Sequence, residues 1–146
     1  MIQRIQTVLL FLAAVALGLQ FLLPYAQSAS GLSGSFSDGV FSVNDRIGLQ
    51  INTGLAFTLA LIAIFLYRNR QAQSRITTLA IFAGAVLAVS VATQCFIIIQ
   101  EAGSEVVNIH YQPGIALPAF SVLLMWIANR FIRKDEELVR SSDRLR

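Results

Sequence analysis

Charged residues are scarce in this chain of 146 residues: Asp, Glu, Lys and Arg make up 13% of the sequence, whereas apolar residues make up 55%. Soluble domains carry about 25% charged residues, so this composition cannot supply an ordinary water-facing surface. Intrinsic disorder is excluded as well, because disordered chains lack the apolar residues that occur throughout this sequence. With a mean hydropathy of +0.66, the sequence indicates an integral membrane protein.

Cysteine and histidine each occur once, as Cys95 and His110. A lone cysteine excludes a disulfide-stapled scaffold, and a lone histidine excludes a zinc site built from several histidines of one chain. Glu101 and Glu105 lie four residues apart, and we interpret them as solvated charges beside a span; the alternative is a weak metal site with His110. Phosphate-binding loops and nucleophile motifs are absent from the sequence. We therefore expect neither an enzyme nor a bound cofactor or metal.

Four long uncharged windows each supply the roughly 17–25 apolar residues that are needed to cross a hydrocarbon core of about 30 Å. They predict transmembrane helices at about residues 5–23, 47–67, 76–100 and 114–132. Helices are expected rather than strands, because lipid offers the backbone no hydrogen-bond partners and the alternating pattern of a membrane barrel is absent. The predicted fold is all-α, a membrane-spanning four-helix bundle in one domain. A basic helical tail, residues 133–146, extends the fourth helix into the cytoplasm.

Basic residues are distributed unevenly around these spans. If the amino terminus is cytoplasmic, 10 of the 11 Lys and Arg residues lie on the inner side, namely Arg4, Arg68, Arg70, Arg75, Arg130, Arg133, Lys134, Arg140, Arg144 and Arg146. Arg46 alone lies outside, and the acidic residues divide evenly between the two sides. The positive-inside rule therefore places both termini in the cytoplasm. We expect the basic residues to contact the bilayer and its anionic lipid headgroups, and we expect no nucleic-acid partner.

The first apolar window has a competing interpretation as a signal peptide. Met1–Arg4 is a short positive start, and the small residues at 26–28 resemble a cleavage site. The apolar core of residues 5–23 is longer than the 7–15 residues that are usual in signal peptides, which favours an uncleaved anchor.

The outer loop at residues 27–44 is rich in Ser and Gly, but it contains the dipeptide Asp38-Gly39. This dipeptide predicts a small outer β-hairpin with Phe36 opposite Phe41. We interpret it as a short ordered loop resting on the helix ends; the alternative is a lid or a hairpin that binds a partner. In the short inner loop at residues 68–75, Ser74 is placed to cap the third helix.

Uncharged polar residues fall at similar depth near the outer ends of the predicted spans: Gln20, Asn52, Thr53, Thr93 and Gln94. We interpret this intramembrane polar cluster as hydrogen bonding between helices, worth roughly 0.5–2 kcal/mol for each bond. The alternative is an outward-facing polar cavity. No ionisable residue lies inside the spans, whereas coupled carriers usually retain one.

A small residue recurs at every fourth position of the third span: Ala80, Gly84, Ala88 and Ala92. Such a ridge lets a neighbouring helix approach closely, and facing surfaces are offered by Ala14 and Gly18 on the first helix and by Ala56 and Ala60 on the second. We interpret the ridge as packing within the monomer; the alternative is a homo-oligomer interface.

The carboxy-terminal segment combines many charges with good helix formers, including Glu136 and Arg140 in the favourable order for a helical pair. We interpret it as a solvated extension that lies on the lipid headgroups. The alternative is a docking helix for another membrane protein.

The two ends of the chain carry a family resemblance. Residues 1–8, MIQRIQTV, and residues 129–146, NRFIRKDEELVRSSDRLR, resemble the signatures of an uncharacterised bacterial family of four-helix membrane proteins, domain of unknown function 4293. The length and the four-span layout are also similar. The resemblance implies a location in the cytoplasmic membrane of a Gram-negative bacterium, and it implies no activity or catalytic residues.

These observations predict a small, non-enzymatic integral membrane protein that serves as a structural or accessory subunit. The alternative function, from a different class, is a small channel or carrier that uses an outward-facing polar cavity. The absence of an intramembrane carboxylate favours the first.

Overall fold

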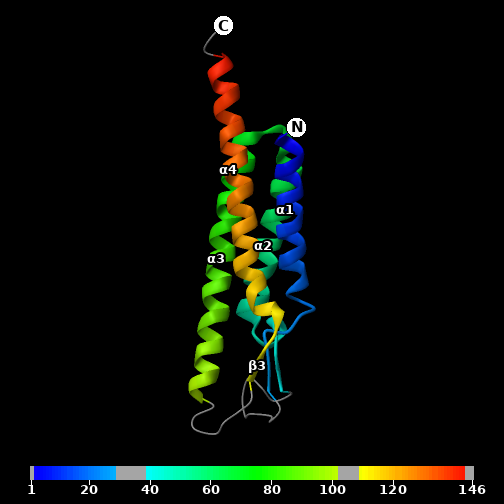
Figure 1. Ribbon diagram of the computed structural model, residues 1–146, viewed down its shortest axis with the longest axis vertical. Helices are drawn as coiled ribbons and strands as arrows, with labels where there is room; N and C mark the ends of the chain where they lie inside the picture. Colours follow the sequence, from blue (N-terminus) through cyan, green and yellow to red (C-terminus); the bar gives the residue numbers. More distant parts are fainter. Residues whose placement is uncertain (1, 29–38, 102–108, 144–146) are drawn as a thin grey trace.

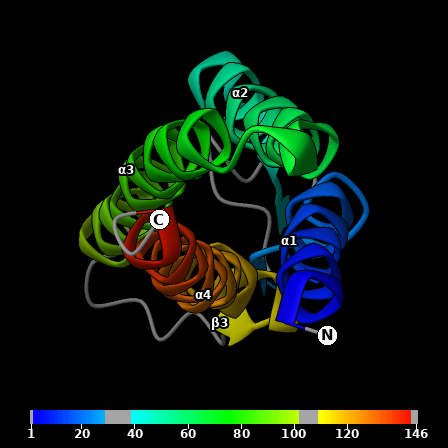
Figure 2. The ribbon, with the colours of Figure 1, turned by 90° about the horizontal axis from the view of Figure 1, so that it is seen from above.

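The computed structural model describes residues 2–28, 39–101 and 109–143, and it confirms the predicted bundle of four helices (Figure 1). The helices are α1 (Ile2–Leu19), α2 (Ile47–Phe65), α3 (Arg70–Glu101) and α4 (Leu117–Asp143). Seen from the end, the helices follow one another around a common centre, and α4 completes the ring against α1 (Figure 2). Successive helices run in opposite directions, as expected for helices joined by short connections.

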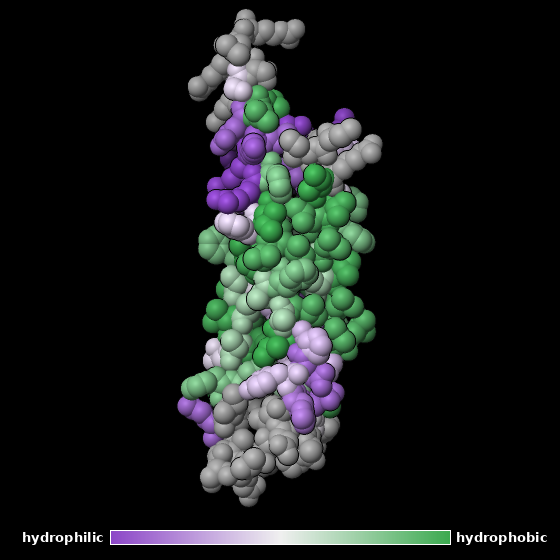
Figure 3. Space-filling view, in the orientation of Figure 1, coloured by the Kyte–Doolittle hydropathy of each residue, from purple (hydrophilic) through white to green (hydrophobic). Residues whose placement is uncertain are grey.

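Among the described residues, three segments are long and apolar enough to cross a membrane: Ile47–Arg68, Arg70–Ile97 and Pro113–Val139. The first helix is shorter, with an apolar part at Ile5–Leu19. Its 18 residues reach about 27 Å, close to the thickness of a hydrocarbon core. An apolar band surrounds the middle of the molecule, with hydrophilic residues at both ends (Figure 3). These features are those of a membrane protein.

The helix boundaries differ from the predicted spans. α1 ends at Leu19 rather than near residue 23, because its last turn tightens and Pro24 disfavours a helical conformation at Leu23. α3 begins at Arg70 rather than at residue 76, since polar residues continue the helix beyond the apolar run. Its cap is Asn69, whose side-chain oxygen accepts a hydrogen bond from the Ala72 amide at 3.1 Å, so the capping role predicted for Ser74 is wrong.

Alanines occupy many of the buried positions of the bundle, beside larger side chains such as Leu10, Leu87 and Met125, whereas the perimeter is formed by large apolar residues. Buried positions include Ala13 and Ala14 on α1, Ala56, Ala60 and Ala63 on α2, Ala80 on α3 and Ala128 on α4. Large apolar side chains such as Leu22, Ile47 and Phe65 are at least three-quarters exposed. In lipid, helices associate through close packing of small residues, and a perimeter this apolar needs a lipid environment.

A small antiparallel sheet lies at the end of the bundle opposite the chain termini (Figure 1). Its strands are β1 (Ala26–Ser28), β2 (Val40–Phe41) and β3 (Ile109–Tyr111), in the order β2-β1-β3. Ala26 pairs with Phe41 on one side and with Tyr111 on the other. Gly39 takes a positive φ of 73°, as the predicted turn requires, while Phe36 and Asp38 lie outside the described residues.

The amino end of α1, the connection between α2 and α3, and the carboxy end of α4 share the other end of the bundle (Figure 1). α4 continues beyond the bundle as one helix through Asp143, which confirms that the predicted tail is helical over the part described. An ion pair between Arg70 and Asp135, with 3.2 Å between nitrogen and oxygen, ties the start of α3 to this extension.

Candidate functional site

Two residues of the predicted polar cluster are completely buried at the sheet end of the interface between α1 and α2. Gln20 follows the last residue of α1, and Thr53 lies in the second turn of α2; each has no exposed surface. Nearby in the fold, Gly18 lies against the Phe57 ring, since a Cβ on Gly18 would be 3.5 Å from Phe57 Cε2. The two helices are antiparallel, so Gln20 and Thr53 both lie on the sheet side of that contact. Measured along the bundle axis from the Gly18–Phe57 contact, their positions differ by about 3 Å.

Tyr25 connects this polar region to the sheet. Its hydroxyl donates a hydrogen bond to Gln20 Oε1 at 2.9 Å, and its ring lies 5.8 Å from that of Phe41. The Tyr25 amide donates to the Phe41 carbonyl, and its carbonyl accepts from the Gln112 amide. Burial raises the pKa of the Tyr25 phenol, so the hydroxyl remains a donor at physiological pH. Tyr25 was not identified from the sequence as part of the polar cluster.

Three buried polar atoms of the cluster have no hydrogen-bond partner among the residues described: Gln20 Nε2, Asn52 Nδ2 and Thr53 Oγ1. Thr53 differs from five other helical hydroxyls, since Thr58, Thr77, Thr78, Ser90 and Thr93 each donate to the carbonyl four residues earlier. A buried polar atom without a partner costs about 1–3 kcal/mol. Each of these atoms, two amide donors and one hydroxyl, can be satisfied by a buried water molecule or a small polar solute.

The other two residues of the predicted cluster, Thr93 and Gln94, are not buried with it. Thr93 is exposed, and its hydroxyl donates to the Val89 carbonyl of its own helix at 2.8 Å. Gln94 is half-buried on α3. Of the predicted cluster, the fully buried residues are therefore Gln20, which follows α1, and Thr53 of α2.

The small-residue ridge of α3 contacts α4 at Gly84. A Cβ on Gly84 would lie 2.9 Å from Val122 Cγ2 and 3.2 Å from Met125 Cε, so only glycine fits this approach without a shift. Ala80 is buried, Ala88 is half-buried and Ala92 is exposed. Of the predicted facing residues, Gly18 of α1 lies against Phe57 of α2 rather than against the ridge.

A second polar network joins α3 to α4 near the chain termini, and sequence reasoning missed it. The Ser74 hydroxyl donates to Asn129 Oδ1 at 3.0 Å, and Asn129 Nδ2 donates to Thr78 Oγ1 at 3.1 Å. Gln73 Nε2 reaches α2, where it donates to the Ala63 carbonyl at 3.0 Å. The available signal was the four-residue spacing of Ser74 and Thr78, which places two hydroxyls on one helix face.

The structure describes one of the three side chains considered for a metal site. His110 is exposed on β3, whereas Glu105 and the side chain of Glu101 fall outside the part of the chain that the structure describes.

Comparisons with known proteins agree with the resemblance of the chain ends. A family model described as a domain of unknown function (DUF4293) matches residues 2–145. No curated protein and no solved structure matches the chain.

Proposed function

The chain belongs to the DUF4293 family, and we propose that it is a non-enzymatic accessory subunit of the cytoplasmic membrane of a Gram-negative bacterium. The observation that carries this proposal is the extension of α4 beyond the bundle as a continuous, highly charged helix (Figures 1 and 3). A neighbouring protein or the membrane surface can contact this extension, which is continuous with the membrane-spanning part of α4.

The proposed orientation places the termini and the connection between α2 and α3 in the cytoplasm. In the part of the chain that the structure describes, these three segments lie at one end of the bundle. The sequence assigns 10 of the 11 basic residues to this side. Lys and Arg near the ends of spans are retained on the cytoplasmic side, so this distribution supports the assignment.

The buried polar residues support a structural role rather than a chemical one. Within the described ranges, every buried polar side chain is a neutral amide or hydroxyl: Gln6, Gln20, Thr53, Gln73, Ser74, Thr77, Ser121 and Asn129. Five of these take part in hydrogen bonds that join helices or reach a backbone carbonyl of their own helix, as in the Ser74–Asn129 contact. Neutral polar groups of this kind typically hold membrane helices together.

The test is affinity purification of the full chain, expressed at its native level, from membranes in a mild detergent. Quantitative mass spectrometry should find one or more proteins in a fixed ratio to the chain, and a variant that ends at Glu137 should lose them. The shortened variant keeps the Arg70–Asp135 ion pair, so its melting temperature should match that of the full chain. Recovery of the chain with no stoichiometric partner would contradict an accessory role.

A second candidate function is a small channel or carrier that opens toward the sheet end. It is favoured by Gln20 Nε2, Asn52 Nδ2 and Thr53 Oγ1, which are buried without partners in the described residues. Liposomes that contain the protein should then take up small neutral solutes faster than empty liposomes. Thr53→Val should lower that rate, whereas Thr58→Val, which changes an exposed hydroxyl bonded to Gly54, should not.

A further inference from the structure

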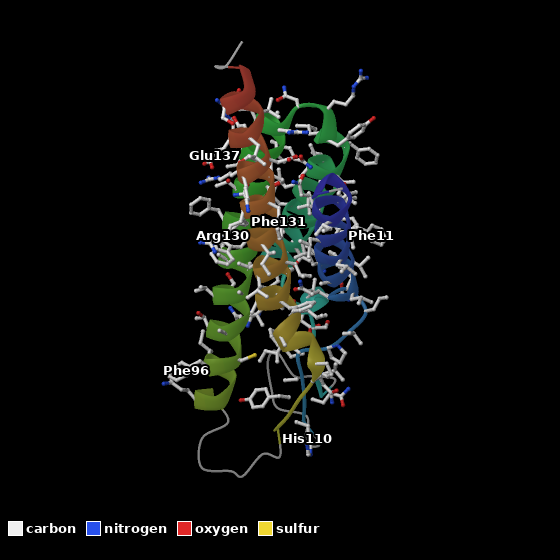
Figure 4. All side chains as sticks on the ribbon, turned by 45° about the horizontal axis from the view of Figure 1, so that its top comes forward. Phe11, Phe96, His110, Arg130, Phe131 and Glu137 are labelled. Atoms are coloured by element: carbon white, nitrogen blue, oxygen red, sulfur yellow. The ribbon has the colours of Figure 1, made fainter. Side chains whose placement is uncertain are left out.

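A groove of about 610 Å³ runs along the outside of the bundle between α3 and α4, next to the end that holds the chain termini. Its α4 wall repeats at helical spacing, with Trp126, Arg130, Arg133 and Glu137 one turn apart from one another. Arg130 and Glu137 lie on the α3 side of α4, and Phe131 lies on the opposite side (Figure 4). Phe82, Trp126 and Arg130 in its lining are exposed, so the groove lies on the outer surface of the bundle.

One end of the groove is cationic. Arg130, Arg133 and Lys134 line it together with a single carboxylate, Glu137. The ion pair that the structure records among the described residues is between Arg70 and Asp135, so it uses none of these four charges. Three positive charges against one negative charge leave a net attraction for an anion.

The other end of the groove is apolar. Ile81 and Phe82 of α3 and the Trp126 ring of α4 line it, and Phe82 is 66% exposed. The Arg130 guanidinium carbon lies 4.4 Å from the centroid of the Trp126 ring, a cation–π contact at the junction of the two ends. From Trp126 to Lys134 the helix rises about 12 Å, so the charged and apolar parts are stacked along the direction of the membrane normal.

The floor between the two ends is held in place by satisfied hydrogen bonds. Asn129 accepts from the Ser74 hydroxyl and donates to Thr78 Oγ1, which in turn donates to the Ser74 carbonyl at 2.8 Å. These bonds link α3 to α4 at the level of Arg130. The groove is therefore preorganised, and a ligand need not order the two helices when it binds.

We propose that this groove binds one anionic glycerophospholipid, with its phosphate beside Arg130, Arg133 and Lys134 and an acyl chain along Phe82 and Trp126. A soluble anion would use only the charged end, whereas a phospholipid matches the order of charge and apolar surface along the whole groove. The Glu137 carboxylate at the outer rim repels a second phosphate, which favours a headgroup with one negative charge. The proposal rests on the chain spanning a membrane, and it does not depend on a partner protein.

The experiment measures lipid retention by the full chain. The protein is reconstituted in nanodiscs of equal parts phosphatidylglycerol and phosphatidylcholine, extracted with mild detergent and examined by native mass spectrometry. We expect retained phosphatidylglycerol in excess over phosphatidylcholine. Arg133→Gln with Lys134→Gln should lower that retention by about fivefold for each charge, corresponding to about 1 kcal/mol for each basic residue near an anionic headgroup.

The matched control is Arg68→Gln with Arg75→Gln, which removes the same charge from exposed positions at the same end of the bundle but outside the groove. Its retention should remain close to that of the unaltered chain. Trp126→Ala, which leaves the charges in place, should also lower retention because it removes the apolar wall.

Four results would overturn the proposal. They are equal retention of the two lipids by the unaltered chain, an equal loss in the control variant, full retention by Trp126→Ala, and displacement of phosphatidylglycerol by millimolar glycerol 3-phosphate. The comparison of the two lipids needs no variant, so it is decisive even if a substitution impairs folding. Because no partner protein enters the measurement, failure here is distinguishable from failure of the accessory role.

Discussion

Replacing Thr53 by Val tests whether the buried polar region near the sheet is dry. Thr53 has no exposed surface, and its hydroxyl has no partner among the residues described. Val has nearly the same shape and a similar helix propensity, so the substitution exchanges the hydroxyl for a methyl group and changes little else. If the site is dry, the substitution removes an unsatisfied polar group that costs about 1–3 kcal/mol, and the bundle becomes more stable.

The opposite sign is expected if the hydroxyl is bonded to a buried water or a bound solute. Thr53→Val then loses a hydrogen bond worth about 0.5–1.5 kcal/mol, and the bundle becomes less stable. An increase in stability indicates a dry site and supports the accessory role. A decrease indicates a bound water or solute and supports the channel or carrier. The sign of the change thus distinguishes the two candidate functions.

The measurement is reversible unfolding in a mild detergent, followed by circular dichroism, with Thr58→Val as the matched control. Thr58 is exposed and donates to the Gly54 carbonyl of its own helix at 2.8 Å, so its loss should change the free energy of unfolding by no more than about 0.5 kcal/mol. A destabilised Thr53→Val protein beside an unchanged Thr58→Val protein would refute the reasoning for a dry site.

Four further outcomes are expected. Gly84→Leu should lower the free energy of unfolding by about 1–3 kcal/mol, because the larger side chain overpacks against α4. The control Gly54→Leu should be tolerated, since a Cβ at Gly54 meets nothing within 4 Å. Equal unfolding midpoints of the two variants would contradict the close approach of α3 and α4. Tyr25→Phe should cost about 1–3 kcal/mol, because it leaves a buried amide oxygen without its donor. Burial raises the pKa of this phenol in the folded chain above its unfolded value of about 10. The free energy of unfolding of the unaltered chain should therefore fall as the pH rises above 10. If the Tyr25→Phe variant lost stability with pH just as steeply, Tyr25 would not be the cause. Reporter fusions after Arg146 should read cytoplasmic and one after Ser37 exterior; the reverse would invert the proposed orientation.

The helical bundle could be predicted from the sequence because the membrane imposes two strong conditions on it. Uncharged windows must be long enough to cross the hydrocarbon core, and basic residues must collect on one side. Both conditions are readable without an alignment, and α2, α3 and α4 appear where the windows lie. The helix ends were less predictable, because the tightened turn after Leu19 and the cap at Asn69 depend on local hydrogen bonds rather than on hydropathy.

The sheet was only partly predictable. β1, β2 and β3 have two or three residues each, too few to show an alternating pattern. The Asp38-Gly39 dipeptide indicated a turn near β2, but the strand that pairs with Phe41 comes from Ala26, and Tyr111 joins from a distant part of the chain. Such pairings are decided by where the helices end in space.

For the candidate sites too, some features follow from the sequence and others only from helix packing. The sequence by itself determined which residues are polar at a given depth, because depth follows from distance along a span, and it identified Gly84 as part of a small-residue ridge. It could not say which way each helix is rotated, since spans that are apolar on every side carry no amphipathic signal. The tertiary structure decided that Gln20 and Thr53 are buried while Thr93 is exposed, and that Gly84 meets α4.

The groove between α3 and α4 depends on that rotation most of all. From the sequence, Arg130, Arg133 and Lys134 are basic residues expected beside lipid headgroups, and nothing in their spacing identifies a binding site. Only the packing of α3 against α4 places Phe82 beside Trp126 at the apolar end of the same groove. The sequence therefore determined the membrane class, the span layout and the asymmetry of charge, whereas the faces that meet were decided by helix packing, because contacts between side chains far apart in the chain select one rotation of each helix.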